Sequence, residues 1–120
     1  MNKAMKMLCC AGVACFAVAA CAAPASAPNP ADAAAVRVIA KKLRAGPPQR
    51  PPQTVKRYLI DGKAFYYVAA PCCDQFNDLY DALGKRVCSP DGGITGRGDG
   101  RCPDIHVDPR QGEIVWRDTR

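Results

Sequence analysis

Four cysteines carry the most reactive side chains in the part of the chain that can fold: Cys72, Cys73, Cys88 and Cys102. Zinc sites and redox pairs commonly use a Cys-x-x-Cys spacing. Here 14 residues separate Cys73 from Cys88, and 13 separate Cys88 from Cys102. The even count therefore predicts two structural disulfides and no metal, provided that the protein is exported to an oxidising compartment.

Three pairings of these cysteines are possible. Adjacent side chains point in opposite directions, so we expect no bridge between Cys72 and Cys73. Two pairings remain open, in which Cys88 bonds either to Cys72 or to Cys73 and Cys102 bonds to the other.

The segment between Cys88 and Cys102 alternates aspartates with glycines. Carboxylate and backbone oxygens are calcium ligands, but the EF-hand spacing is missing and Arg97 and Arg101 oppose a cation. The composition favours a tight loop of glycine and Asx turns, pinned by its flanking cysteines and free of metal or other cofactor. The side chains that this loop offers for interaction are those of Asp91, Ile94, Thr95, Arg97, Asp99 and Arg101.

Evidence for enzymatic catalysis is weak. His106 is the only histidine, and Asp104, His106 and Asp108 alternate as residues on one strand face do. Such a group could bind a metal or hold a general base, but a lone histidine between acids is more often a surface residue. Ser89, the only serine after residue 31, lacks a nucleophile-elbow context. We therefore expect no catalytic residue and no enzyme.

The first 20 residues are typical of a secretory signal peptide: Lys3 and Lys6 precede an apolar run that is too short for a permanent membrane span. Val18-Ala19-Ala20-Cys21 resembles a bacterial lipobox and predicts acylation of Cys21, which anchors the mature chain to the bilayer. Ala22 rather than Asp follows, which favours the outer membrane over the inner. The alternative cleavage, after Ala27, would leave Pro28 as the first residue.

The mature chain is too short for more than one domain. Residues 21–31 form a flexible tether, and residues 32–120 form one domain with a proline-rich spacer at 46–53. Without Lys3 and Lys6, 15 basic residues face 11 acidic ones, for a net charge of +4. This mild charge and the predicted export argue against a nucleic-acid partner.

The remaining elements follow from periodicity. Asp32 can cap a helix that extends to about Leu43, with an apolar face of Val36, Ile39, Ala40 and Leu43. Its basic face, Arg37, Lys41 and Arg44, either touches lipid head groups or is simply solvated, and we favour solvation.

Strands are predicted at 55–60 and 63–69, joined by a type I′ turn at Asp61-Gly62. Two further strands, 76–81 and 85–89, are joined by a turn that ends at Gly84, and a last strand covers 113–116. The fold class is therefore α+β: an N-terminal amphipathic helix followed by a small antiparallel meander, clamped by disulfides. Tyr58, Tyr66 and Tyr67 are more typical of a core than of a binding surface.

One block of residues resembles a known family. Pro71-Cys72-Cys73-Asp74, Leu79-Tyr80-Asp81 and Cys88-x-Pro90-Asp91-Gly92-Gly93-Ile94-Thr95-Gly96-x-Gly98-Asp99-Gly100-x-Cys102-Pro103 are similar to a family of small, uncharacterised bacterial lipoproteins. The resemblance implies a secreted or lipid-anchored domain of unknown function and transfers no catalytic residue.

Two functions remain open. The first is a non-enzymatic binding or structural module of the bacterial envelope, tethered to the membrane and facing the periplasm, with an envelope protein or ligand as its partner. The alternative is an inhibitor of a periplasmic hydrolase that presents the 90–101 loop. An inhibitor loop must protrude, whereas a structural loop packs Ile94 and Thr95 inward.

Overall fold

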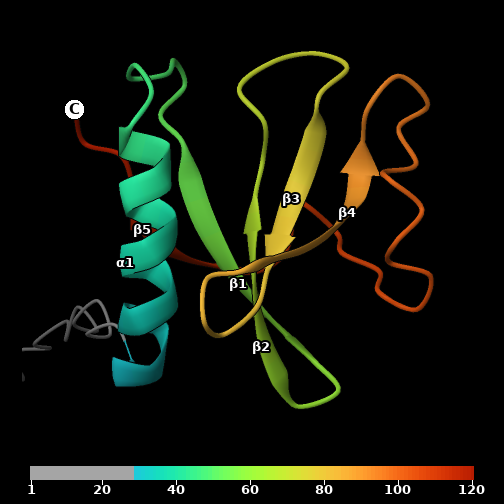
Figure 1. The fold of residues 1–120 in the computed structure, drawn as a ribbon, viewed down its shortest axis with the longest axis horizontal. Helices are drawn as coiled ribbons and strands as arrows, with labels where there is room; N and C mark the ends of the chain where they lie inside the picture. Colours follow the sequence, from blue (N-terminus) through green and yellow to red (C-terminus); the bar gives the residue numbers. More distant parts are fainter. Residues whose placement is uncertain (1–28) are drawn as a thin grey trace, which may run out of the picture.

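The computed structural model describes residues 29–120. The expected signal peptide, Cys21 and most of the expected tether lie outside the described residues. Within them, one short helix, α1 (Pro30–Arg44), precedes five strands: β1 (Thr54–Ile60), β2 (Lys63–Val68), β3 (Phe76–Tyr80), β4 (Arg86–Gly92) and β5 (Glu113–Arg117). The strands form one antiparallel sheet in the order β4-β3-β2-β1-β5, and α1 lies beside it (Figure 1). No helix among residues 29–120 is long and apolar enough to cross a bilayer.

The start of α1 differs from the expectation. Asn29 is the N-cap, and its side chain accepts a hydrogen bond of 3.1 Å from the N–H of Ala31. Pro30 follows at the first helical position, where its fixed φ suits the helix. Asp32, the expected cap, lies in the first turn instead and is buried. Asparagine followed by proline at the first helical position is the sequence signal for this start.

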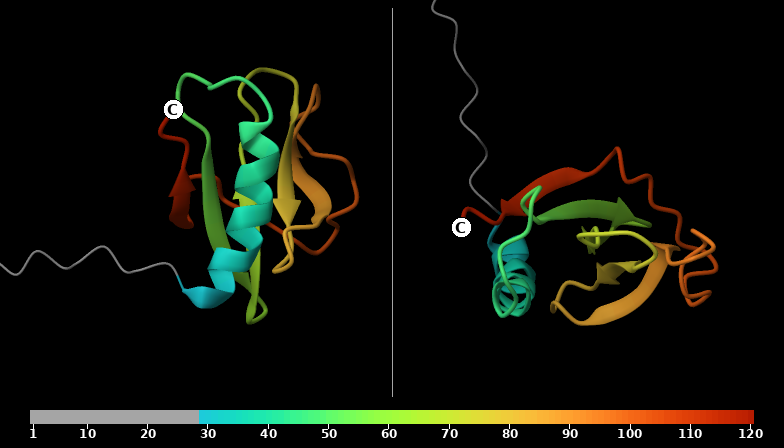
Figure 2. Two further views of the ribbon diagram at one scale, coloured as in Figure 1. Left: turned by 60° about the vertical axis from the view of Figure 1, so that its left-hand side comes forward. Right: turned by 90° about the horizontal axis from the view of Figure 1, so that it is seen from above.

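α1 packs on one face of the sheet through Ala35 and Ile39, which meet Val55, Tyr66, Val68 and Tyr80. Viewed from above, the sheet curves around the helix (Figure 2). Burying a side chain of the size of Ile39 contributes roughly 1.5–3 kcal/mol to the stability of the fold. A buried hydrogen bond of 2.6 Å from the Tyr66 hydroxyl to Asp32 joins helix to sheet, and burial raises the pKa of Tyr66 to about 12.

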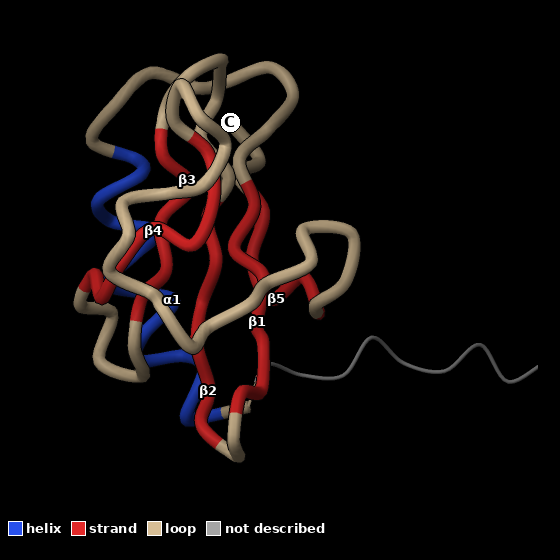
Figure 3. The backbone as a smooth tube through the Cα atoms, turned by 90° about the vertical axis from the view of Figure 1, so that its right-hand side faces the viewer, coloured by secondary structure: helices blue, strands red, loops and turns tan. Residues whose placement is uncertain are grey.

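The opposite face of the sheet carries a second, smaller core. Tyr67, Leu79 and Cys88 are buried there beneath Cys102, Ile105 and Val107. Figure 3 shows the irregular chain before β5 crossing in front of this face. Tyr66 and Tyr67 therefore serve opposite faces, and Tyr58 meets Tyr67 edge to face at 6.0 Å. The three tyrosines do not form one binding surface.

The β1–β2 hairpin has the predicted two-residue turn, because Ile60 pairs with Lys63 and both turn residues have positive φ, 50° at Asp61 and 74° at Gly62. No atom lies within 4 Å of a Cβ built on Gly62, so a side chain there meets only backbone strain. We expect Gly62→Val to lower the free energy of unfolding by about 1–3 kcal/mol. Gly62→Asn is the control, since asparagine tolerates this conformation and should lose far less. Equal denaturation midpoints for the two variants would rule out this turn.

Asp118 fastens the C-terminal tail to the sheet. It is 3% exposed and lies 2.8 Å from the Arg120 guanidinium, which also donates to the carbonyls of Arg44 and Gly46 at the end of α1. The hydrogen bonds from Arg120 lower the pKa of Asp118 to about 2. An unfolded aspartate titrates near pH ~3.9. The stabilisation is therefore complete above that value and is lost as the pH falls through about 2.

We expect the stability margin of the wild type over Asp118→Asn to be constant from pH 7 to about 4 and to vanish near pH 2. Denaturant midpoints of both proteins at each pH give this margin directly. Other carboxylates titrate in both proteins and cancel from the difference. A margin that is the same at pH 2 and pH 6 would show that the ion pair contributes nothing.

Candidate functional site

The 93–97 loop, which follows β4, presents the most exposed large apolar side chain of the described residues. Ile94 is 89% exposed, and Thr95 and Arg97 beside it are also exposed. Neither Ile94 nor Thr95 packs inward. By the criterion of loop exposure, this loop is presented to solvent and not folded onto the core.

Backbone hydrogen bonds fix the base of the 93–97 loop. The N–H of Gly98 donates to the carbonyl of Gly92 at 3.1 Å, and the N–H of Asp99 donates to the carbonyl of Ser89 at 3.0 Å. Gly98 has a φ of 72°, and a Cβ there would overlap the Ser89 carbonyl oxygen. Only glycine therefore allows the returning chain to lie so close to β4.

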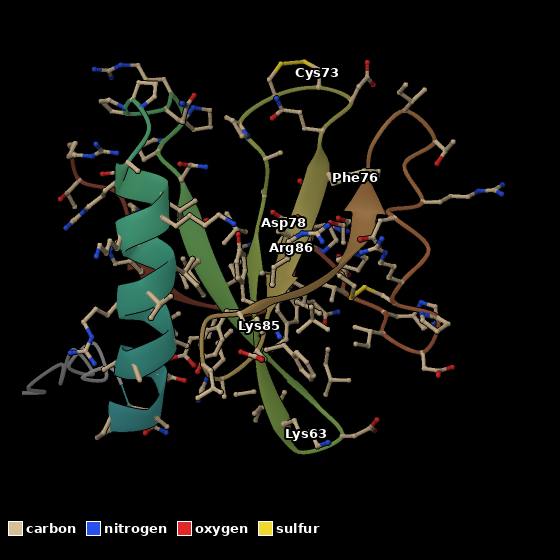
Figure 4. The ribbon with its side chains drawn as sticks, in the orientation of Figure 1. Lys63, Cys73, Phe76, Asp78, Lys85 and Arg86 are labelled. Atoms are coloured by element: carbon tan, nitrogen blue, oxygen red, sulfur yellow. A yellow bond between two sulfur atoms is a disulfide. The ribbon has the colours of Figure 1, made fainter. Side chains whose placement is uncertain are left out.

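A cluster of charged and polar side chains also stabilises the base of the 93–97 loop. Arg86 donates to Asp78 at 2.8 Å, to the Ser89 hydroxyl at 2.7 Å and to Asp99 at 3.0 Å. The Ser89 hydroxyl donates in turn to Asp78 at 2.8 Å. Figure 4 shows Asp78 and Arg86 side by side between β3 and β4. The hydrogen bond and charge of Asp78 raise the pKa of Arg86, whose guanidinium stays charged and holds Asp99 in place.

Sequence reasoning missed Asp78, Arg86 and Ser89 as determinants of the loop. Their contact depends on two irregularities in the β3–β4 register, between Asn77 and Leu79 and between Leu79 and Tyr80. Strand periodicity alone does not place such bulges. β4 also continues to Gly92, whereas the strand was predicted to end at residue 89.

The other predicted loop residues have separate roles. Asp91 faces the second core, where Tyr67 donates to it at 3.0 Å and Asn77 at 2.8 Å. Asp99 belongs to the cluster, and its side chain also accepts from the N–H of Arg101 at 3.0 Å. The Arg101 side chain is exposed. Ile94, Thr95 and Arg97 are therefore the residues that the loop offers to a partner.

The disulfide pairing differs from both expected pairings. Cys72 bonds to its neighbour Cys73, and Cys88 bonds to Cys102. The expectation assumed an extended chain, but Cys72 and Cys73 lie in a turn between β2 and β3, followed by Asp74 at a φ of 55°. Side chains of a turn need not alternate. Cys88 is fully buried on the second core, where Cys102 covers it and neither of the other two cysteines reaches.

Asp104, His106 and Asp108 do not share a strand face, contrary to the expectation. All three lie in irregular chain and not on a strand, and the side chain of His106 is exposed. Residues 29–120 contain no group of three or more His, Cys, Asp or Glu side chains that could hold a metal ion.

An apolar groove of about 690 Å³ lies between α1 and β5. Val36, Ala40, Val115 and Trp116 contribute its apolar lining. The three side chains of the predicted basic helix face also line it, and Arg44 lies over the ring of Trp116 at 5.4 Å. The basic face is therefore partly engaged in packing and not only solvated.

The fold and the loop together define a small α+β domain with two disulfides and one protruding, fixed loop. Residues 41–118 match the family described as a domain of unknown function, DUF6970, and the match covers more than half of the chain. The chain belongs to that family. No curated protein and no solved structure matches it. Membership in an uncharacterised family is thus confirmed, whereas the lipoprotein character stays a prediction.

Proposed function

We propose that this protein is a non-enzymatic lipoprotein of the bacterial envelope that binds a protein partner through its 93–97 loop. The observation that carries the proposal is the 89% exposure of Ile94 on a loop whose base is held by backbone hydrogen bonds. An apolar side chain at a loop tip loses water contact only when a partner covers it. The partner class is therefore a protein with an apolar pocket and, for Arg97, an acidic rim.

Rigidity supports this function. A loop that is already ordered loses little conformational freedom on binding, so more of the contact energy appears as affinity. The Cys88–Cys102 disulfide, the hydrogen bonds of Gly98 and the Arg86 cluster all restrict the loop before a partner arrives.

The arrangement of the fold suits a membrane tether. α1 and the 93–112 segment lie on opposite sides of the sheet (Figures 1 and 2). The chain between Cys21 and Pro30 spans at most about 30 Å when extended. Acylated Cys21 would hold the domain near the outer membrane by its helix side, and the loop would remain accessible to proteins of the periplasm.

A separate prediction concerns the lipid anchor at Cys21. Metabolic labelling with a fatty acid should label the wild-type protein, and Cys21→Ser should abolish both the label and processing. The reason is that serine lacks the thiol to which the lipid is attached before cleavage. An unlabelled mature form that begins at Pro28 would contradict the anchor.

The binding loop is tested by co-purification of the full lipoprotein from detergent-solubilised envelopes. Ile94→Asp should lose the bound protein because it places a charge in the partner's apolar pocket. Leu83→Asp is the matched control, since Leu83 is also an exposed apolar residue, 79% exposed, on a different turn. Equal recovery of the same partner with both variants would reject the loop as the binding site.

Inhibition of a periplasmic hydrolase is the second candidate, and the same protrusion favours it. A fixed loop closed by a disulfide can occupy an active-site cleft without being cleaved. If the captured partner is a hydrolase, the wild-type protein should inhibit it and Ile94→Asp should not. If the captured partner has no hydrolytic activity, the inhibitor function is excluded and the function as a binding module stands.

A further inference from the structure

The two disulfides lie in very different surroundings. Cys88 is fully buried, whereas Cys72 and Cys73 are both exposed at the end of the sheet. Figure 4 shows the sulfur–sulfur bond beside Cys73 on the loop that joins β2 and β3. A thiolate from another molecule can reach the Cys72–Cys73 bond without any opening of the fold.

The two disulfides also differ in how much they stabilise the fold. The Cys88–Cys102 bond closes a segment with a sequence separation of 14, which restricts the unfolded chain. The Cys72–Cys73 bond joins residues with a separation of 1 and closes no such segment. Folding therefore protects the first bond against reduction and gives almost no protection to the second.

The vicinal disulfide is connected to the base of the 93–97 loop. Two residues after the vicinal pair, the carbonyl of Gln75 accepts a hydrogen bond of 2.9 Å from the N–H of Gly93, the residue that follows β4. A cavity of about 250 Å³ is lined both by the two cysteines and by Gly92 and Gly93. The conformation of the 72–75 turn is thus linked to the first residue of the loop.

We propose that Cys72–Cys73 is a thiol–disulfide exchange site whose redox state controls the base of the 93–97 loop. The substrate class is a dithiol, such as a reduced Cys-x-x-Cys protein. One thiolate of the dithiol attacks one of the two sulfurs, forms a mixed disulfide and releases the other cysteine as a thiolate. The second thiol of the dithiol then resolves the mixed disulfide.

The exchange transfers two electrons and two protons to this protein. Cys72 and Cys73 end as two free thiols, and the dithiol ends as a disulfide. Without the bond that joins them, the two residues are free to change conformation, and the hydrogen bond between Gln75 and Gly93 loses its support. The exchange chemistry does not depend on the proposed partner binding.

Graded reduction of the full chain with dithiothreitol, followed by alkylation and peptide mass spectrometry, tests the site. Reduction of Cys72–Cys73 should be favoured over reduction of Cys88–Cys102 by about 100-fold in the equilibrium constant, which is the loop-closure difference expressed as a ratio. Reduction of both bonds together, or of Cys88–Cys102 first, would overturn the proposal.

Hydrogen exchange of the Gly93 amide tests the link to the loop. Selective reduction should accelerate its exchange, and a chain with Cys72→Ala and Cys73→Ala should exchange equally fast with or without the reductant. The Gly62 amide, in the distant hairpin, is the control and should not change. An unchanged Gly93 amide in the reduced protein would overturn the switch, and neither result depends on whether the loop binds a partner.

Discussion

Replacing Cys88 and Cys102 together with alanine should lower the free energy of unfolding by about 3 kcal/mol, in the range of about 2–5 for a small secreted domain. The double replacement of Cys72 and Cys73 should lower it by less than about 0.5 kcal/mol, as expected for an exposed site. The reason is the difference in loop closure, with separations of 14 and 1. Cys88 is also fully buried, so its replacement removes packing in the second core.

Urea denaturation of the four proteins, namely the wild type, each double variant and the quadruple variant, measures both values. The quadruple variant should be about as stable as the Cys88/Cys102 variant, since the effects of independent sites add and the loss from replacing Cys72 and Cys73 is small. A large loss in the Cys72/Cys73 variant would contradict the pairing, because it would mean that those cysteines close a long segment of chain.

Gly98→Ala should be the most damaging single substitution at the base of the 93–97 loop. A Cβ at this position would overlap the Ser89 carbonyl oxygen, and the three nearest atoms all belong to the β4 backbone, which cannot shift without disturbing the strand. We expect a loss of about 2 kcal/mol or more, together with release of the loop base. Partner capture should fall in parallel, because the fixed base is what presents Ile94.

Gly96→Ala is the matched control for that substitution. Gly96 has nearly the same φ, 71° against 72°, but no atom lies within 4 Å of a Cβ built there. The difference between the two variants therefore isolates the close approach from the backbone strain. Denaturant midpoints and limited proteolysis at 93–101 give the comparison. Equal stability of the two alanine variants would mean that the loop does not lie against β4.

Local signals sufficed for much of the fold. Asp61-Gly62 marked the β1–β2 turn, and Gly84, with a φ of 77°, ended the β3–β4 turn where the sequence placed it. The last strand was predicted at 113–116 and is present as β5. Such elements depend on residues that are close in the sequence, so periodicity and turn chemistry capture them.

Long-range contacts were not predictable in the same way. The choice of disulfide partners depended on which face of the sheet Cys88 occupies, and that face is set by the irregular β3–β4 register. The Arg86 cluster joins residues from three segments, Asp78, Arg86 with Ser89, and Asp99. The sequence identified the loop as a candidate for interaction, but only the structure separates its exposed tip from its fixed base.

Photo-crosslinking in living cells tests the central claim most directly. A photoreactive phenylalanine analogue at position 94, and the same analogue at position 83 as control, would be introduced into the full-length lipoprotein. The proposed function predicts a discrete adduct with one envelope protein from position 94 and none from position 83. Adducts at neither position, or the same adducts at both, would contradict a binding function for the 93–97 loop.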